Sequence, residues 1–369
     1  MTSFAIPNRD GIQSRQIAFF AAFVLPVYKL METPSLLAGF LQGDLLVPAI
    51  LHFLIEFGLI VALLYCASRS EKTILERLID TLGSWVKIVY GALCVFFLAV
   101  AILPLLDLEK FVYSVFYDTA PTLFSFGFFF IFSAFLATKG IKALGRLGDL
   151  SLFLFALPFF ALIAMSLTEA DFTNLLPFFE KGFGDTMYAM NYTKAHFCDA
   201  IFLLPLIMNL RFQKGDGIKI SAGYLGGAFM TLLFLAVFYG LFSSIAPREH
   251  YAFAKIAQYF PVLSVVGRID LLFVYIVCIV LFFFVATPLH YATHFLSSIF
   301  DSKGKTLFST IVCLALFVFT LFFNRRYDSV YQLFCTVLFP IFYLFDFGVL
   351  LLLLLPKNRI KKHKENSYA

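Results

Sequence analysis

The stretch LPVYKLMETPSLL, residues 25–37, carries a lysine and a glutamate inside an otherwise apolar segment. Lys29 and Glu32 lie three residues apart, and Pro26 and Pro34 bracket them. Two ionisable groups near the centre of a bilayer cost about 5–7 kcal/mol, and the apolar residues around them return roughly the same amount. Each proline also removes a backbone donor and disfavours helix before it. The stretch therefore predicts a broken membrane helix whose freed backbone groups face a cavity.

The composition of the whole chain supports a membrane setting. Of its 369 residues, 61% are hydrophobic and 14% are charged, whereas a soluble domain carries about 25% charged residues. The mean hydropathy is +0.90, and the 51 phenylalanines equal in number all Lys, Arg, Asp and Glu residues. A globular fold of this size has too little interior to hide so much apolar surface. The values exclude a soluble enzyme, a nucleic-acid-binding protein and a secreted disulfide scaffold, and predict an all-α polytopic membrane protein.

Apolar runs of about 20 residues, the length of a spanning helix, occur ten times along the chain. They predict ten transmembrane helices at about 16–41, 46–67, 84–106, 121–138, 150–168, 195–210, 218–245, 268–298, 306–323 and 329–355. We expect one transmembrane domain over 1–369, with a five-helix repeat at about 12–168, a second at about 195–356 and a basic tail at 357–369. Because five is odd, the second repeat would be inverted in the membrane. This 5+5 inverted-repeat plan is typical of secondary transporters.

Lysine and arginine are unevenly distributed between the two sets of alternate connections. One set, together with both termini, holds 19 of the 28 basic residues, and the other set holds 8. Cytoplasmic connections of membrane proteins carry the excess of basic residues. The bias predicts that both termini are cytoplasmic and that the long connection 169–194 lies outside.

The sixth predicted span, AHFCDAIFLLPLIMNL at 195–210, repeats the pattern of the first span in the second half of the chain. Asp199 precedes Pro205 by six residues, which predicts a second broken helix. The positive ends of half-helices suit a ligand carboxylate, and Asp199 would accept from a ligand ammonium group. Two alternatives stay open. The first span could be only kinked, with a structural Lys29–Glu32 pair, or the sixth span could begin at Asp199 and leave this acid at the outer interface.

Other polar or small residues within the spans have structural interpretations. His52 and Glu56 are four residues apart on one helix face and favour a structural pair over a proton relay. Gly223 and Gly227 form a GxxxG pattern, which is typical of two helices in close approach. The sequence shows no phosphate loop, no nucleophile elbow and no paired catalytic carboxylates. We therefore predict no enzymatic activity, no cofactor and no metal site.

Five short segments spaced along the chain carry a resemblance to a known membrane-protein family. They are IQSRQ at 12–16, PSLLA at 34–38, FVYSVFYDTAPTLF at 111–124, TKGIKALGRLGDL at 138–150 and DFTNLLPFFEKGF at 171–183. With these segments the chain resembles the endospore germination permease family, the GerAB-like B subunits of nutrient germinant receptors. That family belongs to the amino acid–polyamine–organocation (APC) superfamily. Within the resemblance, Asp199 and Asp270 occupy the acidic positions of the family's sixth and eighth spans.

The resemblance implies a function and a set of partners. The chain would be the B subunit of a spore germination receptor, which binds a small nutrient germinant, an amino acid, in a midplane cavity and signals germination. It would lie in the bacterial cell membrane or spore inner membrane, beside a membrane A subunit and a lipoprotein C subunit. The alternative is an amino-acid permease, a secondary transporter coupled to protons. The expected ligand-binding residues are Tyr28, Lys29, Glu32, Thr33, Asp199, Phe202 and Asp270, and the expected helix breaks lie at Pro26, Pro34 and Pro205.

Overall fold

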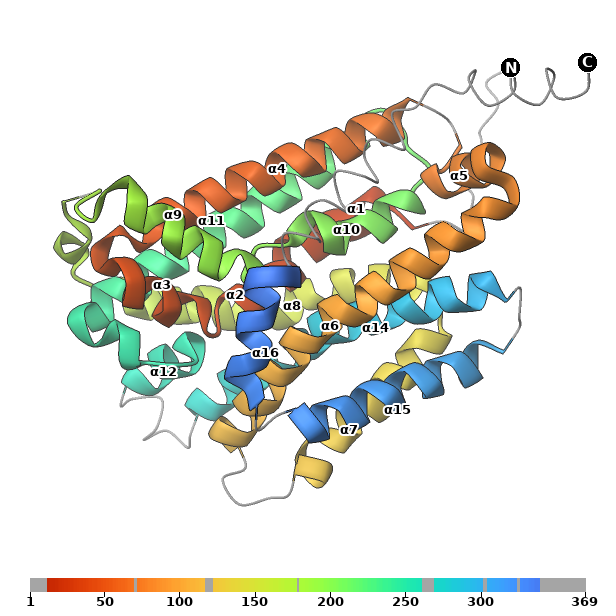
Figure 1. Ribbon diagram of the computed structural model, residues 1–369. Coiled ribbons are helices and arrows are strands. Elements are labelled where there is room, and N and C mark those ends of the chain that lie inside the picture. The colour runs from red at the N-terminus through yellow and green to blue at the C-terminus, as the bar shows by residue number, and fades with distance from the viewer. Residues whose placement is uncertain are drawn as a thin grey trace, which may run out of the picture.

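The described part of the chain is helical throughout. The computed structural model describes residues 12–69, 72–116, 122–177, 179–260, 269–300, 304–323 and 326–338, and within them every regular element is a helix (Figure 1). Six of these helices are long and apolar enough to span a membrane, namely Thr33–Ser68, Gly83–Ser114, Ile141–Ser166, Asp216–Arg248, Leu271–Ile299 and Lys305–Phe323. A seventh apolar helix, Phe126–Thr138, is shorter. The chain is therefore an all-helical membrane protein that crosses the bilayer several times.

Helices lie in each of the first nine predicted spans, and the tenth, 329–355, is described only as far as Leu338. The first span holds α1 (Ser14–Phe19), the π-helix η1 (Phe20–Val24), α2 (Leu25–Lys29) and α3 (Thr33–Leu41). The following spans hold α4 (Leu46–Ser68), α6 (Val86–Phe116), α7 (Thr122–Thr138), α8 (Ile141–Ser166), α10 (Asp199–Met208), α11 (Asp216–Phe242), α14 (Ile269–Ile299) and α15 (Lys305–Phe323). Two short elements, α16 (Tyr327–Leu333) and the π-helix η8 (Phe334–Leu338), follow α15.

The long helices pack as pairs around the first span. α6 and α14 contact each other along their length, α7 packs beside α15, and α4 lies along α11 (Figure 1). Large apolar side chains on the outward faces are exposed, among them Phe128, Phe153 and Ile218. Such faces suit the hydrocarbon of a bilayer.

Short helices join the spans on both sides of the bundle. α5 (Ile74–Leu82) begins with a capping box in which Thr73 and Glu76 exchange backbone-to-side-chain hydrogen bonds. The hydrogen bond from the Thr73 backbone N–H, followed by the contact with Arg211, lowers the pKa of the Glu76 carboxyl. α12 (Ala252–Tyr259) follows α11.

The predicted outer connection 169–194 is folded and docked. It contains the 3-10 helix η4 (Phe172–Leu175) and the helix α9 (Gly182–Thr193). Asp171 caps η4 by accepting from the Thr173 backbone N–H at 2.9 Å. The buried carboxylate of Asp44 accepts from the backbone N–H groups of Phe179 at 2.6 Å and Lys181 at 2.9 Å. The connection is thus tied to the turn between α3 and α4 by charge-assisted hydrogen bonds.

Glycines clamp the first span between α8 and α11, and the close approach expected of Gly223 and Gly227 is confirmed. A Cβ atom at Gly223 would overlap the backbone of Ala18, and Gly227 makes a similar approach to the same helix. On the opposite side, a Cβ atom at Gly148 of α8 would lie 2.7 Å from the carbonyl oxygen of Gln16. α1 and η1 therefore contact both neighbours backbone to backbone, as small residues permit in membrane helices.

This clamp predicts that Gly223→Ala destabilises the protein by about 1–3 kcal/mol, because the new methyl group must displace the backbone of α1. Thermal unfolding of the purified protein in detergent measures the effect. Gly226→Ala on the same helix is the matched control, because a Cβ atom there meets nothing within 4 Å. Equal melting temperatures for the two variants would contradict the clamp.

Candidate ligand site at two helix breaks

The first span is interrupted between α2 and α3. α2 ends at Lys29 and α3 begins at Thr33, with a turn over residues 30–32. The carbonyl oxygen of Met31 accepts from the backbone N–H of Ala252 at 2.9 Å, and that of Leu30 accepts from Phe253 at 3.2 Å. Sequence reasoning placed such freed groups on a cavity. The structure instead satisfies these two carbonyls with the first N–H groups of α12, which have no partner inside their own helix.

Of the three prolines expected at the helix breaks, Pro34 lies next to one, in the first turn of α3, where a missing N–H costs no helical hydrogen bond. Pro26 lies inside the continuous helical run 14–29, directly after the π-helix η1, so the chain is not broken there. Pro205 lies inside α10, and its carbonyl oxygen accepts from the Asn209 side chain at 2.8 Å.

A second interruption lies at the sixth span. α9 continues into the 3-10 helix η5 (Lys194–His196), residues 197–198 are not helical, and α10 begins at Asp199. Asp199 is 2% exposed, so its carboxylate is buried within the protein. α9 packs against α3 and α4, and α10 packs against α4, so the two interrupted spans meet on one side of the bundle.

A buried ion pair joins the two breaks. The Lys29 ammonium lies 2.5 Å from Oδ1 of Asp199, and both side chains are buried. The same ammonium lies 3.4 Å from the carbonyl oxygen of Leu25 and faces the rings of Phe53 and Phe197 at 5.9 and 5.6 Å. Lys29 therefore pairs across the two spans and not with its neighbour in sequence, and the ammonium on Asp199 belongs to the chain itself.

Glu56 and His52 of α4 contact different parts of the sixth span. Glu56 is 1% exposed and accepts from the backbone N–H of Ala200, in the first turn of α10, at 2.8 Å. The His52 ring stacks on Phe197 with centroids 4.5 Å apart, and its Nε2 lies 3.2 Å from the carbonyl oxygen of Met190. His52 thus contacts the chain before the second break, and Glu56 binds the first turn of α10 after it.

An enclosed pocket lies next to the first break. Its polar lining comes from Tyr28, Glu32, Asp107, His196 and Tyr251, and its apolar lining from Met31, Leu108, Phe111 and Leu281. The cavity measures about 10 Å³, which holds roughly one water molecule. Two carboxylates from different helices therefore face one small enclosed space.

Tyrosine hydroxyls satisfy the carboxylates of this pocket. Tyr28 donates a short hydrogen bond to Asp107, and Tyr327 donates to the other oxygen of Asp107 at 2.5 Å. Tyr327 also lies 3.5 Å from Oε2 of Glu32. The Lys110 ammonium lies over the Tyr327 ring, 3.2 Å from its centroid. The cluster holds two acidic groups and one basic group.

His196 and Thr33 have unused polar atoms beside the cluster. The His196 ring stacks on Tyr28 with centroids 5.2 Å apart and is 2% exposed. Among the described residues, neither of its ring nitrogens makes a hydrogen bond, and neither does the buried Thr33 hydroxyl. A buried polar atom without a partner is costly, so the imidazole of His196, which lines the pocket, favours a polar guest there.

The structure gathers only some of the residues expected at the site. Tyr28 and Glu32 line the pocket, and Lys29 and Asp199 form the ion pair behind it. The Phe202 carbonyl accepts from Tyr291 at 2.8 Å, and the Phe202 ring stacks on Phe284. Asp270 belongs to the first turn of α14, and its side chain lies outside the described residues.

Sequence reasoning missed Asp107, which the structure places at the centre of the cluster. A signal was present, because Asp107 follows Pro104 by three residues inside an apolar run. That combination resembles the pattern that identified the first span. Tyr251 and Tyr327 carry no comparable signal, because a tyrosine near a span end is ordinary in membrane proteins.

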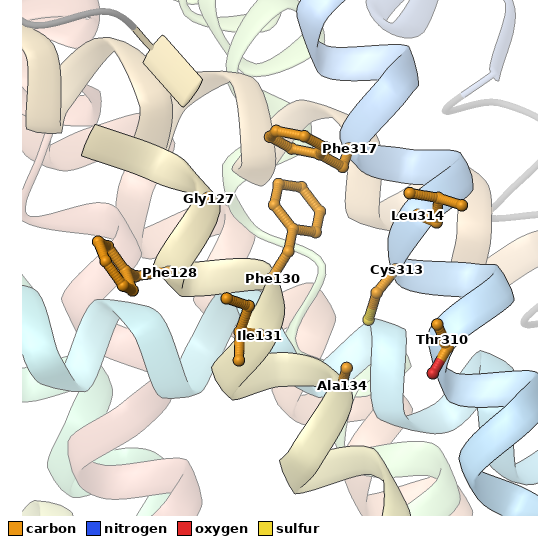
Figure 2. Close-up of a pocket in the computed structure, with 9 residues that line it drawn as sticks. All are labelled: Gly127, Phe128, Phe130, Ile131, Ala134, Thr310, Cys313, Leu314 and Phe317. Atoms are coloured by element: carbon orange, nitrogen blue, oxygen red, sulfur yellow. The ribbon is translucent and has the colours of Figure 1, made fainter. Parts of the chain in front are cut away.

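A larger hollow of about 380 Å³ lies between α7 and α15 (Figure 2). Its lining is apolar apart from Thr310, and Phe128, Ile131 and Leu314 are largely exposed at its rim. An open apolar groove on the outside of a membrane bundle suits lipid chains. The polar pocket at the helix breaks is therefore the candidate ligand site.

Two interrupted helices that meet at buried charges in an apolar bundle define a transporter-like membrane protein. The family model described as spore germination protein, or spore permease, matches residues 46–329, more than three quarters of the chain. The chain belongs to this family. No curated protein matches the sequence.

Proposed function

We propose that this protein is the B subunit of a spore germination receptor, which binds a small nutrient germinant and signals germination. Membership of the spore germination family supports a germination-related, transporter-like role. The observation that carries the proposal is the enclosed pocket at the first helix break, with the half-buried carboxylate of Glu32, the buried carboxylate of Asp107 and the unpartnered imidazole of His196. Such a pocket can recognise a small polar molecule. We propose no enzymatic activity.

The proposed ligand is an amino acid, recognised through both of its charged ends. Its ammonium group would contact Glu32 and Asp107, because Asp199 already pairs with the Lys29 ammonium. Its carboxylate would contact the Lys110 ammonium, which lies over the Tyr327 ring, 3.2 Å from its centroid. Charge-assisted hydrogen bonds of this kind are about twice as strong as neutral ones.

The proposed architecture is a ten-helix, 5+5 inverted repeat within one transmembrane domain. Its support is that the first span and the sixth span, which open the two halves, are the ones interrupted at buried charges.

We further propose that both termini are cytoplasmic, that the protein lies in the spore inner membrane, and that a membrane A subunit and a lipoprotein C subunit are its partners. The charge bias supports the orientation, and the family supports the partners.

A working amino-acid permease is the second candidate function. It is favoured by the neighbouring carboxylates Glu32 and Asp107, both bound to Tyr327, because paired intramembrane acids can carry protons. Deletion of the gene separates the two functions. The receptor predicts loss of the germination response to one nutrient with vegetative uptake of that nutrient unchanged, and the permease predicts the reverse.

The orientation predicts different labelling of two exposed lysines after replacement by cysteine. Lys181, an exposed residue within the outer connection 169–194, should react with a membrane-impermeant maleimide in intact cells as Lys181→Cys. Lys214→Cys, between α10 and α11, should react only after permeabilisation. Five of the six cysteines, Cys66, Cys94, Cys198, Cys278 and Cys313, are buried, which keeps the background low. The opposite pattern would invert the topology.

The ligand site predicts that Asp107→Asn weakens the germination response to the amino acid. Loss of one hydrogen bond to a charged group costs about 1.5–3 kcal/mol, so the half-maximal concentration should rise by roughly 10- to 150-fold. Dose–response curves of spores with equal amounts of receptor measure the shift. Asp328→Asn makes the same chemical change at an exposed position of α16 and should leave the curve in place. A normal curve for Asp107→Asn would remove this acid from the site.

A further inference from the structure

The start of α10 binds one ammonium group and one carboxylate, and both belong to the chain. Asp199 and Ala200 are consecutive residues in the first turn of this helix. The Asp199 carboxylate holds the ammonium of Lys29 at 2.5 Å, and the Ala200 backbone N–H holds the carboxylate of Glu56 at 2.8 Å. A free amino acid carries these two kinds of charged group, and here they are bound at consecutive residues of one half-helix.

The surroundings of each group are those of a binding site for a charged ligand. The Lys29 ammonium is enclosed by a carboxylate, the Leu25 carbonyl and the rings of Phe53 and Phe197. A carboxylate and aromatic faces together form an ammonium site in proteins. The Glu56 carboxylate lies at a helix N-terminus, where free N–H groups and the helix dipole favour an anion.

Burial excludes solvent from this arrangement. Lys29 and Glu56 are each 1% exposed, and Asp199 and Ala200 are each 2% exposed. Lys29 comes from α2 and Glu56 from α4, so three helices meet at the two contacts. A free amino acid at this place would have to displace both side chains.

We propose that Lys29 and Glu56 act as a built-in ligand, so that the half-helix junction is an amino-acid site permanently filled by the chain itself. The junction between α2, α4 and α10 is then closed without any solute or coupling cation. This inference does not depend on the proposed receptor function, because it concerns how the junction is held and not what the pocket beside Tyr28 recognises.

The proposal predicts chemical rescue. Lys29→Ala removes three carbons and the ammonium, the equivalent of n-propylammonium, and leaves Asp199 buried without its partner. We expect the melting temperature of the purified full-length protein in detergent to fall by about 5–10 °C. Millimolar n-propylammonium should restore most of this loss, and tetramethylammonium at the same ionic strength should not, because it cannot donate a hydrogen bond to Asp199.

The carboxylate is tested in the same way. Glu56→Ala removes the equivalent of acetate, so acetate should stabilise this variant and chloride should not. Lys72→Ala is the control for non-specific effects, because Lys72 forms an exposed ion pair with Asp80 at 2.6 Å. Neither ion should change its melting temperature relative to the unsubstituted protein.

The outcomes separate a filled binding site from an ordinary structural contact. Rescue of each variant by its own ion alone supports the proposal. No rescue, or equal rescue by tetramethylammonium, overturns it. If Lys29→Ala does not accumulate, its expression in cells supplied with n-propylammonium decides: the return of folded protein with this ion and not with tetramethylammonium supports the proposal, and its continued absence overturns it.

Discussion

The buried ion pair between Lys29 and Asp199 is the interaction on which the arrangement of the helices depends. Neither charge could lie alone in the apolar interior of a membrane protein, because an unpaired ion there costs several kcal/mol. Each charge lies at the end of a short half-helix, one in each half of the chain. The pair therefore requires the two interrupted spans to meet, and the positions of α4 and α9 around them follow from that meeting.

The interruptions create a second requirement, which is that every freed backbone group finds a partner without help from water. The structure meets it with side chains and helix ends from elsewhere in the fold. The first N–H groups of α12 bind the carbonyls of Leu30 and Met31, and Glu56 binds the N–H of Ala200. This explains why the segments between spans fold into short helices. α12 contributes hydrogen bonds to the break that the span cannot make for itself.

The sequence predicts the helical class, the position of most spans and the close approach at Gly223, because hydrophobic runs and small-residue spacing are local signals. It places the first break correctly, because Pro26, Pro34 and two charges lie within a few residues of one another. It does not predict the partner of Lys29, because Glu32 is three residues away and Asp199 is 170 residues away. The turn at residues 30–32 separates Glu32 from Lys29 and directs it toward Tyr327. Lys29 pairs with Asp199 and not with Glu32 because the first and sixth spans meet in the folded protein.

The small size of the polar pocket limits how the proposed ligand can enter. A cavity of about 10 Å³ holds one water molecule, so an amino acid requires some wall of the pocket to move. The wall formed by α2 is fixed on one side by the glycine contacts of the first span and on the other by the ion pair with Asp199. α12 and α16 are held at the cluster by two backbone hydrogen bonds and by the Tyr327 hydroxyl. Movement of these two helices leaves the Lys29–Asp199 ion pair intact, whereas movement of α2 breaks it. We therefore expect ligand binding to move α12 and α16 first and to leave the Lys29–Asp199 ion pair unchanged.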